Sequence, residues 1–219
     1  MLRALFEKTG NAVYISHLDL MRLFQRGFKR AGLHLTHTQG YNPRPSVSIA
    51  LPLSVGVESH CELLDFELEG EPVSCEEIMD RLNQALVDGV KVRSVYEDGD
   101  KTKDLSLLDC TVYLEYDQGI SDEMVKELEA LFAQPTLLVE KRSKNGMADQ
   151  DIIPMIRNIA ISVEDSHVLC ICARICCQNP TLNPAQMVAA IVRYLPQYTP
   201  DFARYCRNEI YRNDETIFR

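Results

Sequence analysis

Apolar residues recur every three or four positions between residues 17 and 31, the spacing that places side chains on one face of a helix. Ser16 is a typical helix N-cap, and Gly32 suits the left-handed position that follows a helix end. We therefore expect a helix that packs on a sheet through the apolar stripe Leu20, Leu23, Phe24, Gly27, Phe28 and Ala31.

Segments of alternating apolar and polar residues lie on both sides of this helix, and a period of two is typical of strands. In the first half of the chain the pattern predicts a second helix at 76–87 and strands at 2–8, 47–51, 61–68 and 90–96. The resulting order is strand, helix, strand, strand, helix, strand. This is the order of the ferredoxin-like fold.

The second half of the chain repeats this order with additions. The pattern predicts a flexible loop at 141–150, helices at 122–133 and from Pro184 onward, and strands at 110–116, 136–140, 159–163, 168–175 and 205–211. The polar stretch 97–104 separates the halves, so we expect an N-terminal domain at 1–98 and a C-terminal domain at 105–219. The predicted fold class is α+β, with two tandem ferredoxin-like units that have antiparallel sheets, the second unit being elaborated.

Charge is distributed unevenly along the 219 residues. The net charge is −9, yet residues 1–60 hold seven Lys and Arg against three Asp and Glu, whereas residues 61–219 hold sixteen against twenty-nine. The negative total argues against indiscriminate nucleic-acid binding, and an anionic partner is expected to meet the basic first quarter. There, four cations gather along one edge of the predicted helix with no acidic residue among them: Arg22, Arg26, Lys29 and Arg30.

The loop after this helix, HTQGYNPRP, combines the residue types that recognition of single-stranded RNA uses. Tyr41 offers a ring on which a base stacks, the amides of Gln39 and Asn42 match base edges, and Arg44 is a cation for phosphate. Two other interpretations stay open. The basic edge is an ordinary solvated helix face, or the loop is a rigid connection that packs Tyr41 against the helix.

Two histidines are candidate catalytic residues. His17 lies at the start of the helix and His37 lies in the loop, and they meet if the loop folds back over the helix start. A pair of imidazoles is able to activate a ribose 2′-hydroxyl, which makes an RNA endonuclease or a transferase an alternative function. A structural, hydrogen-bonded role is the simpler interpretation of His17, beside a helix cap.

Metal-binding patterns are weak. The eight cysteines include no CxxC pair, and the cluster Cys170, Cys172, Cys176 and Cys177 begins by alternating with apolar residues, as in a buried strand. We favour structural cysteines over an iron or zinc site, and we expect no cofactor. Asp65, Glu67 and Glu69 share one face of a predicted strand, where exposure to solvent is favoured over metal binding.

The sequence contains no run of about 18 apolar residues, and its first residues lack the regions of a secretory signal. We therefore expect a cytoplasmic protein with reduced thiols and no membrane contact.

The chain resembles the domain of unknown function 2344 (DUF2344), often called the radical-SAM-linked protein family, in FEKTG, YISHLDLMRLFQRGFKRAGL, THTQGYNPRPSVSIALPLSVGVES and ELLDFEL. The resemblance implies that such domains occur alone or fused behind a radical S-adenosylmethionine (radical-SAM) enzyme that also has a cobalamin-type domain. The chain has no CxxxCxxC motif, so in such an association it is the accessory half. The family name supplies no reaction.

Three functions are compatible with these patterns. We favour a non-catalytic accessory protein that binds RNA and presents it to a partner radical-SAM modification enzyme. One alternative is a protein-interaction module that docks on that enzyme without RNA. The other is the RNA endonuclease or transferase that uses His17 or His37.

Overall fold

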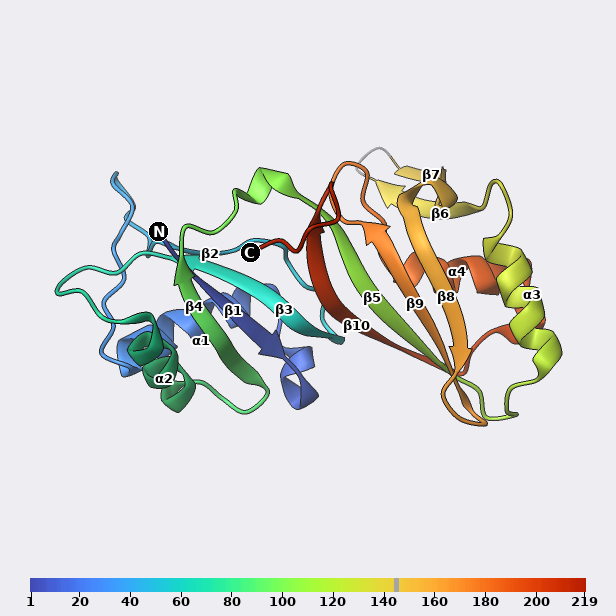
Figure 1. Cartoon of the computed structure of the whole chain (residues 1–219), viewed down its shortest axis with the longest axis horizontal. Helices are drawn as coiled ribbons and strands as arrows, with labels where there is room; N and C mark the ends of the chain where they lie inside the picture. Colours follow the sequence, from blue (N-terminus) through green and yellow to red (C-terminus); the bar gives the residue numbers. More distant parts are fainter. Residues whose placement is uncertain (144–145) are drawn as a thin grey trace. The chain divides into compact units, whose positions relative to one another are not determined.

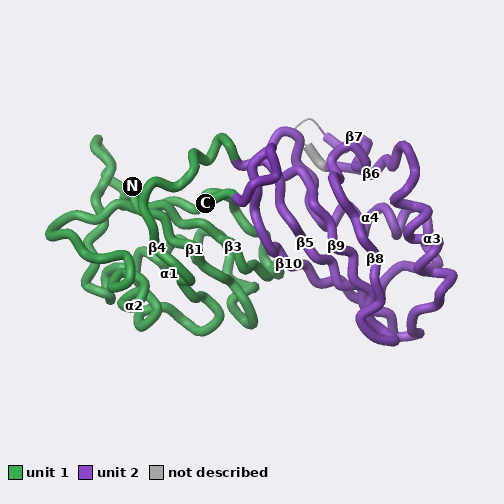
Figure 2. Tube along the Cα trace, viewed as in Figure 1, with its two compact units in different colours: residues 1–104, 218–219 green, residues 105–217 purple. Residues whose placement is uncertain are grey.

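The computed structural model describes residues 1–143 and 146–219. In this part of the chain there are four α-helices and ten strands, and the strand pairings within each unit are antiparallel. The chain forms two compact units, shown in Figure 2: unit 1 holds residues 1–104 and 218–219, and unit 2 holds residues 105–217. The predicted α+β class is confirmed.

Unit 1 is one antiparallel sheet with two helices (Figure 1). Its sheet has the strand order β4-β1-β3-β2. The elements are β1 (Leu2–Lys8), the 3₁₀ helix η1 (Gly10–Tyr14), α1 (His17–Arg30), β2 (Val47–Ile49), β3 (Val57–Phe66), α2 (Cys75–Ala85), β4 (Val90–Glu97) and η2 (Thr102–Asp104).

Helix α1 begins and ends where local chemistry predicts. The Ser16 hydroxyl accepts a hydrogen bond from the Asp19 N–H, and Gly32 has φ +68°, a left-handed conformation that favours glycine after a helix. Most of the predicted stripe is buried against the sheet, and Leu23 and Ala31 are partly buried. The centre of the Phe24 ring lies 4.7 Å from that of Phe6, and the centre of the Phe28 ring lies 4.8 Å from that of Phe66. Helix α2 packs on the same face through Ile78 and Leu82, so both helices share one core with the sheet.

The other face of this sheet buries an ion pair. Nε of Arg3 on β1 lies 2.6 Å from a carboxylate oxygen of Asp65 on β3, and Nη2 lies 3.0 Å from the other oxygen. The expectation that Asp65 faces solvent is therefore wrong: it is 6% exposed, and Arg3 is 3% exposed. Glu67 and Glu69, beyond the end of β3, are exposed as expected.

Several groups cover the Arg3 guanidinium. Its Cζ lies 5.2 Å from the centre of the buried Phe218 ring, and a Cβ atom on Gly99 would lie 2.8 Å from Nη1. Gly99 therefore leaves the room that the guanidinium occupies. The Arg219 N–H donates to the Asp100 carboxylate at 3.1 Å, which fixes Phe218 in place within unit 1.

Unit 2 has a four-stranded sheet of order β10-β5-β9-β8 and a separate β6-β7 hairpin. The elements are β5 (Leu105–Glu115), α3 (Asp122–Phe132), β6 (Leu138–Ser143), β7 (Gly146–Asp151), η3 (Ile153–Met155), β8 (Ile156–Val163), β9 (Val168–Cys176), α4 (Ala185–Tyr194), η4 (Pro196–Tyr198) and β10 (Phe202–Arg212). One face of the four-stranded sheet is apolar and buried, through Val112, Leu114, Leu169, Ile171 and Ile175.

The hairpin occupies most of the segment predicted as a flexible loop, so that prediction is wrong for residues 141–143 and 146–150. Residues 144–145 lie outside the described residues. Helix α4 holds the hairpin: Arg193 pairs with Asp149 at 2.8 Å, and the Tyr194 hydroxyl donates to the Leu138 carbonyl at 3.0 Å. The pattern predicts the start of β6, within 136–140, but the rest of the hairpin is held by polar groups, which explains why hydrophobic alternation does not reveal it.

The buried ion pair generates a stability prediction. Asp65→Ala should lower the free energy of unfolding by about 3–5 kcal/mol, because Arg3 then stays buried without its counter-charge. Urea unfolding followed by circular dichroism measures the change. The double variant Arg3→Met/Asp65→Leu should recover most of the loss, because no charge remains to be buried.

The exposed Glu69 provides a matched control for removing a carboxylate. Glu69→Ala should change the free energy of unfolding by less than about 0.5 kcal/mol. If Asp65→Ala cost no more than Glu69→Ala, the ion pair would not stabilise unit 1.

Candidate nucleic-acid interface

Residues 36–46, called the arm, form a narrow hairpin between α1 and β2. The Ser46 N–H donates to the Thr36 carbonyl, and the Thr38 N–H donates to the Arg44 carbonyl, both at 2.8 Å. The Arg44 N–H donates in turn to the Thr38 hydroxyl at 3.0 Å. At the base of the arm, the backbone carbonyl of Glu67 accepts a hydrogen bond from the Thr36 N–H, and the Glu67 N–H donates one to the Ser46 carbonyl. The arm is thus fixed to the end of β3.

The tip of the arm, residues 39–43, turns at Gly40, whose φ of +137° favours glycine. Every residue of the tip is exposed, and Tyr41 is 108% exposed, as open to solvent as an isolated tyrosine. The interpretation in which Tyr41 packs against the helix is therefore wrong. The candidate side chains Gln39, Asn42 and Arg44 are exposed with it, as is His37.

The four cations Arg22, Arg26, Lys29 and Arg30, called the basic edge, are all exposed on α1. The side chains of Arg26 and Lys29 make no ion pair or hydrogen bond to any described residue, and the same holds for the Arg44 side chain on the arm. Helix α1 ends at Arg30 and the arm begins at residue 36, so the basic edge and the arm follow each other along the chain. Three cations without an ion pair and the exposed ring of Tyr41 thus belong to one continuous stretch, residues 26–44.

Two members of the basic edge have protein partners that sequence reasoning missed. Nη1 of Arg22 lies 2.9 Å from the carboxylate of Asp19, which stands one turn earlier on the helix and pairs with it. Hydrogen bonds from Ser16 and Arg22 hold the pKa of Asp19 below its usual value. Arg30 donates from Nε and Nη2 to the Ala85 carbonyl in the last turn of α2. Arg30 therefore caps a helix end, where a cation is favourable.

The two candidate catalytic histidines are not brought together. His17 opens α1, which is 14 residues long and spans roughly 20 Å at 1.5 Å per residue. His37 lies beyond the other end of the helix, where it pairs with Pro45 in the arm. His17 Nδ1 is buried without a hydrogen-bond partner among the described residues, in contrast to the hydrogen-bonded role that its position suggests.

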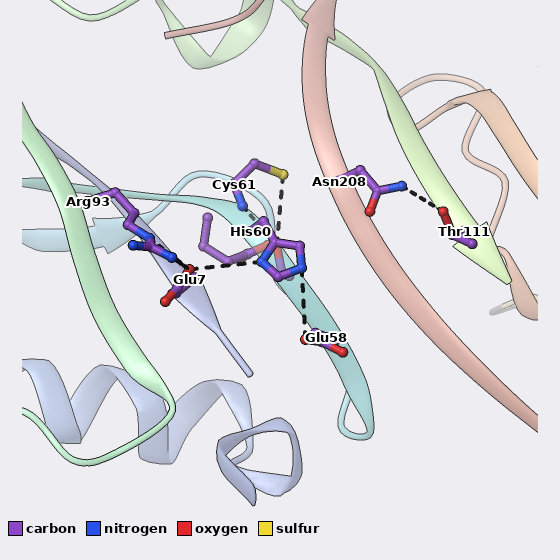
Figure 3. A network of polar contacts seen from close by, with 9 residues as sticks. Glu7, Glu58, His60, Cys61, Arg93, Thr111 and Asn208 are labelled. Carbon is purple, nitrogen blue, oxygen red and sulfur yellow. Dashed lines mark hydrogen bonds and ion pairs between the residues drawn. The ribbon is translucent and has the colours of Figure 1, made fainter. Parts of the chain in front are cut away.

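A third histidine belongs to a charged cluster that the sequence pattern did not predict (Figure 3). His60 lies with Nδ1 3.9 Å from Glu7 and Nε2 3.8 Å from Glu58, and Nε of Arg93 donates to Glu7 at 2.7 Å. The cluster joins β1, β3 and β4, whose residues are far apart in the sequence, so only the register of the sheet reveals it. The two histidine contacts are longer than hydrogen bonds.

The four cysteines of the sequence cluster lie on β9 and just beyond its end. Cys170 and Cys176 are buried on β9, Cys177 is buried just beyond it, and Cys172 is exposed. Burial raises the pKa of Cys170 and of Cys177 to about 12, which opposes the thiolate form that binds metals. Within the described residues, no group of three or more His, Cys, Asp or Glu side chains is placed to hold a metal ion.

The family model for "Uncharacterized protein conserved in bacteria (DUF2344)" matches residues 1–184. The chain belongs to the DUF2344 family. A solved structure, described as an unknown protein from Galdieria sulphuraria, matches over 94% of this chain and 96% of its own, with 12% identity and a TM-score of 0.27. No curated protein matches the sequence.

The matched region of this DUF2344 chain contains the arm and the basic edge. None of the helices in the described part of the chain is long and apolar enough to cross a membrane.

The exposure of the tip predicts that its side chains contribute little to stability. Tyr41→Ala and Asn42→Ala should each change the free energy of unfolding by no more than about 0.5 kcal/mol, because they remove no buried contact. Phe66→Ala, which empties a buried site beneath α1, should cost about 3–5 kcal/mol. Urea unfolding compares the three variants, and a loss for Tyr41→Ala near that of Phe66→Ala would mean that the ring is packed.

Proposed function

We propose that this DUF2344 protein is a non-catalytic accessory protein that binds single-stranded RNA through the arm and the basic edge of unit 1. The observation that carries the proposal is the complete exposure of Tyr41 at the tip of a braced hairpin. A side chain of this size that packs on nothing in its own protein is suited to pack on a partner.

The chemistry of the surface favours RNA as that partner. A base that stacks on an aromatic ring contributes about 1–3 kcal/mol, and amide groups such as those of Gln39 and Asn42 recognise base edges. Arg26, Lys29 and Arg44 are available to phosphates, because their side chains form no ion pair or hydrogen bond with the described residues. The hydrogen bonds that brace the arm lower the entropy lost on binding.

The topology adds support from fold. We infer that both units are ferredoxin-like and stand in tandem. In unit 1 the chain order βαββαβ accompanies the sheet order β4-β1-β3-β2. In unit 2 the order β10-β5-β9-β8 repeats this arrangement, with the β6-β7 hairpin inserted after α3. Sheets of this topology serve RNA recognition in other proteins, and that support is analogy.

A radical-SAM enzyme is the proposed partner to which the RNA is presented. Support comes from the resemblance of the sequence motifs to a family linked with such enzymes and from the missing CxxxCxxC motif. The separation of His17 and His37 by the length of α1 weighs against the alternative in which they act as a catalytic pair. The alternative of docking on the enzyme without RNA requires the basic edge to contact protein.

The binding proposal predicts a steep dependence on salt. Single-stranded host RNA should bind with an affinity that falls as salt rises, and Arg26→Ala/Lys29→Ala/Arg44→Ala should flatten the slope of log K against log salt by about 2, because each lost phosphate contact removes about 0.7. Fluorescence anisotropy measures the series.

A charge-matched variant controls for the loss of three positive charges. Lys103, Lys126 and Arg157 are exposed and lie outside the arm and the basic edge. Lys103→Ala/Lys126→Ala/Arg157→Ala should keep the wild-type slope. Equal slopes in the two triple variants would place the RNA elsewhere, and absence of binding at low salt would overturn the proposal.

The partnership predicts co-purification that depends on RNA. Affinity capture of the tagged protein from its host, followed by mass spectrometry, should recover a radical-SAM enzyme, and RNase treatment before capture should weaken the recovery. Full recovery after RNase treatment would favour the docking module instead. Absence of any radical-SAM enzyme would argue against both forms of the partnership.

A further inference from the structure

The sheet of unit 2 has an open face opposite its buried apolar face, and a shallow trough lies across it. The trough encloses about 320 Å³, at the lower end of the range for small-ligand pockets. Its lining comes from all four strands, which contribute Asp109, Cys110, Asn158, Ala160, Cys172, Ala173, Arg174 and Asn208.

Small residues make the floor of the trough flat. Ala160 on β8 and Cys172 on β9 are neighbours across the two strands, and both are exposed. On the other side of Cys172, its partner on β5 is Thr111, which is buried. At these three positions the side chains are small, so a planar ring has room to lie on this part of the sheet.

The cation beside this floor is neutralised. Arg174 donates to both carboxylate oxygens of Asp109 at 2.8 and 3.0 Å and to Glu215 at 2.6 Å. Its Cζ lies 4.0 Å from the centre of the Tyr211 ring, so the guanidinium is stacked over that ring and fixed in orientation. The trough thus offers a fixed planar wall with little net positive charge, and a neutral ring suits it better than a phosphate.

Two amides stand at opposite sides of the trough. Asn158 on β8 is exposed, and its side chain makes no hydrogen bond to the described part of the chain. Asn208 on β10 donates from Nδ2 to the Thr111 hydroxyl at 2.8 Å, an arrangement that Figure 3 shows. This bond orients the Asn208 amide and leaves its Oδ1 as an acceptor. Donors and acceptors of this kind match the edges of a nucleobase.

We infer that the trough binds one nucleobase of single-stranded RNA, with a purine preferred over a pyrimidine. The inference rests on the proposed function, because it says which part of the RNA the trough binds in addition to the arm and the basic edge. The strands of Asn158 and Asn208 are three spacings apart, which places their Cα atoms about 14 Å from each other. A purine with a hydrogen bond at each end spans this width better than a single ring does.

Cys172 provides a direct probe of the trough. It is the exposed cysteine of the chain, whereas Cys75 in unit 1 is partly exposed and the other six are buried. Alkylation of the native protein with iodoacetamide, quantified at each cysteine by peptide mass spectrometry, therefore reports occupancy of the trough at Cys172. Cys75 serves as the internal reference for reagent activity.

We expect adenosine or guanosine at millimolar concentration to slow alkylation of Cys172 at least fivefold, with less slowing by cytidine and uridine and no change at Cys75. Asn158→Ala should abolish the protection, and its exposed side chain makes misfolding no concern. Ser162→Ala, two residues beyond Ala160 on the same exposed edge strand, should keep it. Saturation-transfer NMR of adenosine should lose its signal with Cys172→Phe, which fills the floor.

Unchanged alkylation with all four nucleosides would overturn the inference, as would protection that survives Asn158→Ala. If RNA binds through the basic edge while nucleosides leave Cys172 unprotected, the trough inference fails and the arm proposal stands. If purine nucleosides protect Cys172 while no RNA binds at low salt, the proposed function fails and the trough is a nucleoside site.

Discussion

The buried ion pair between Arg3 and Asp65 is the constraint on which unit 1 depends. A guanidinium and a carboxylate removed from water are tolerated only when they face each other in good geometry, and this requirement fixes the register of β1 against β3. Asp65 is also opposite Ser48 on β2. Two residues later, the backbone of Glu67 is hydrogen-bonded to both ends of the arm, at Thr36 and Ser46. The position of the proposed RNA-binding tip is therefore inherited from a contact on the far side of the sheet from the helices.

Local physics made much of unit 1 predictable from sequence. Ser16 and Gly32 bound α1 because caps act within a few residues, and the apolar stripe identifies the face that packs on the sheet. The burial of Asp65 was not predictable in this way, because its partner is 62 residues away and an alternating carboxylate normally indicates exposure. The same holds for the trough, whose polar residues come from four strands and share no sequence motif.

The candidate RNA site shows a similar division. The sequence favours the arm as an RNA site, since its residue types are those that RNA recognition uses, and this function stays a prediction. It did not predict that Tyr41 stands free, because exposure depends on the hydrogen bonds that brace the arm against Glu67. It also did not predict that the Arg30 side chain donates a hydrogen bond to the Ala85 carbonyl, because that contact depends on how α2 packs beside α1. Residue type thus indicated the chemistry, and only the fold distinguished the free cations from the engaged ones.

Arginine has two uses in this protein: some arginines brace the fold through ion pairs, as Arg3 does with Asp65, and others stay exposed without one. In unit 2, Arg174, Arg193 and Arg204 are each paired with carboxylates, and each guanidinium also lies over a tyrosine ring. In unit 1, Arg26 and Arg44 are exposed and form no ion pair with the described residues. The excess of acidic residues after residue 60 therefore neutralises cations that brace the fold, and it leaves the attraction for anions concentrated in the first quarter of the chain.

Phe218 is buried in unit 1, over Arg3, although the chain completes all of unit 2 before it reaches this residue. During synthesis, β1, β3 and β4 are made long before Phe218, whose ring covers Arg3. The Arg3 guanidinium therefore lacks this part of its cover until more than a hundred further residues have been added. Final closure of the earlier unit is thus a late event in synthesis. The two units do not mature strictly in the order in which they are translated, as independent domains do.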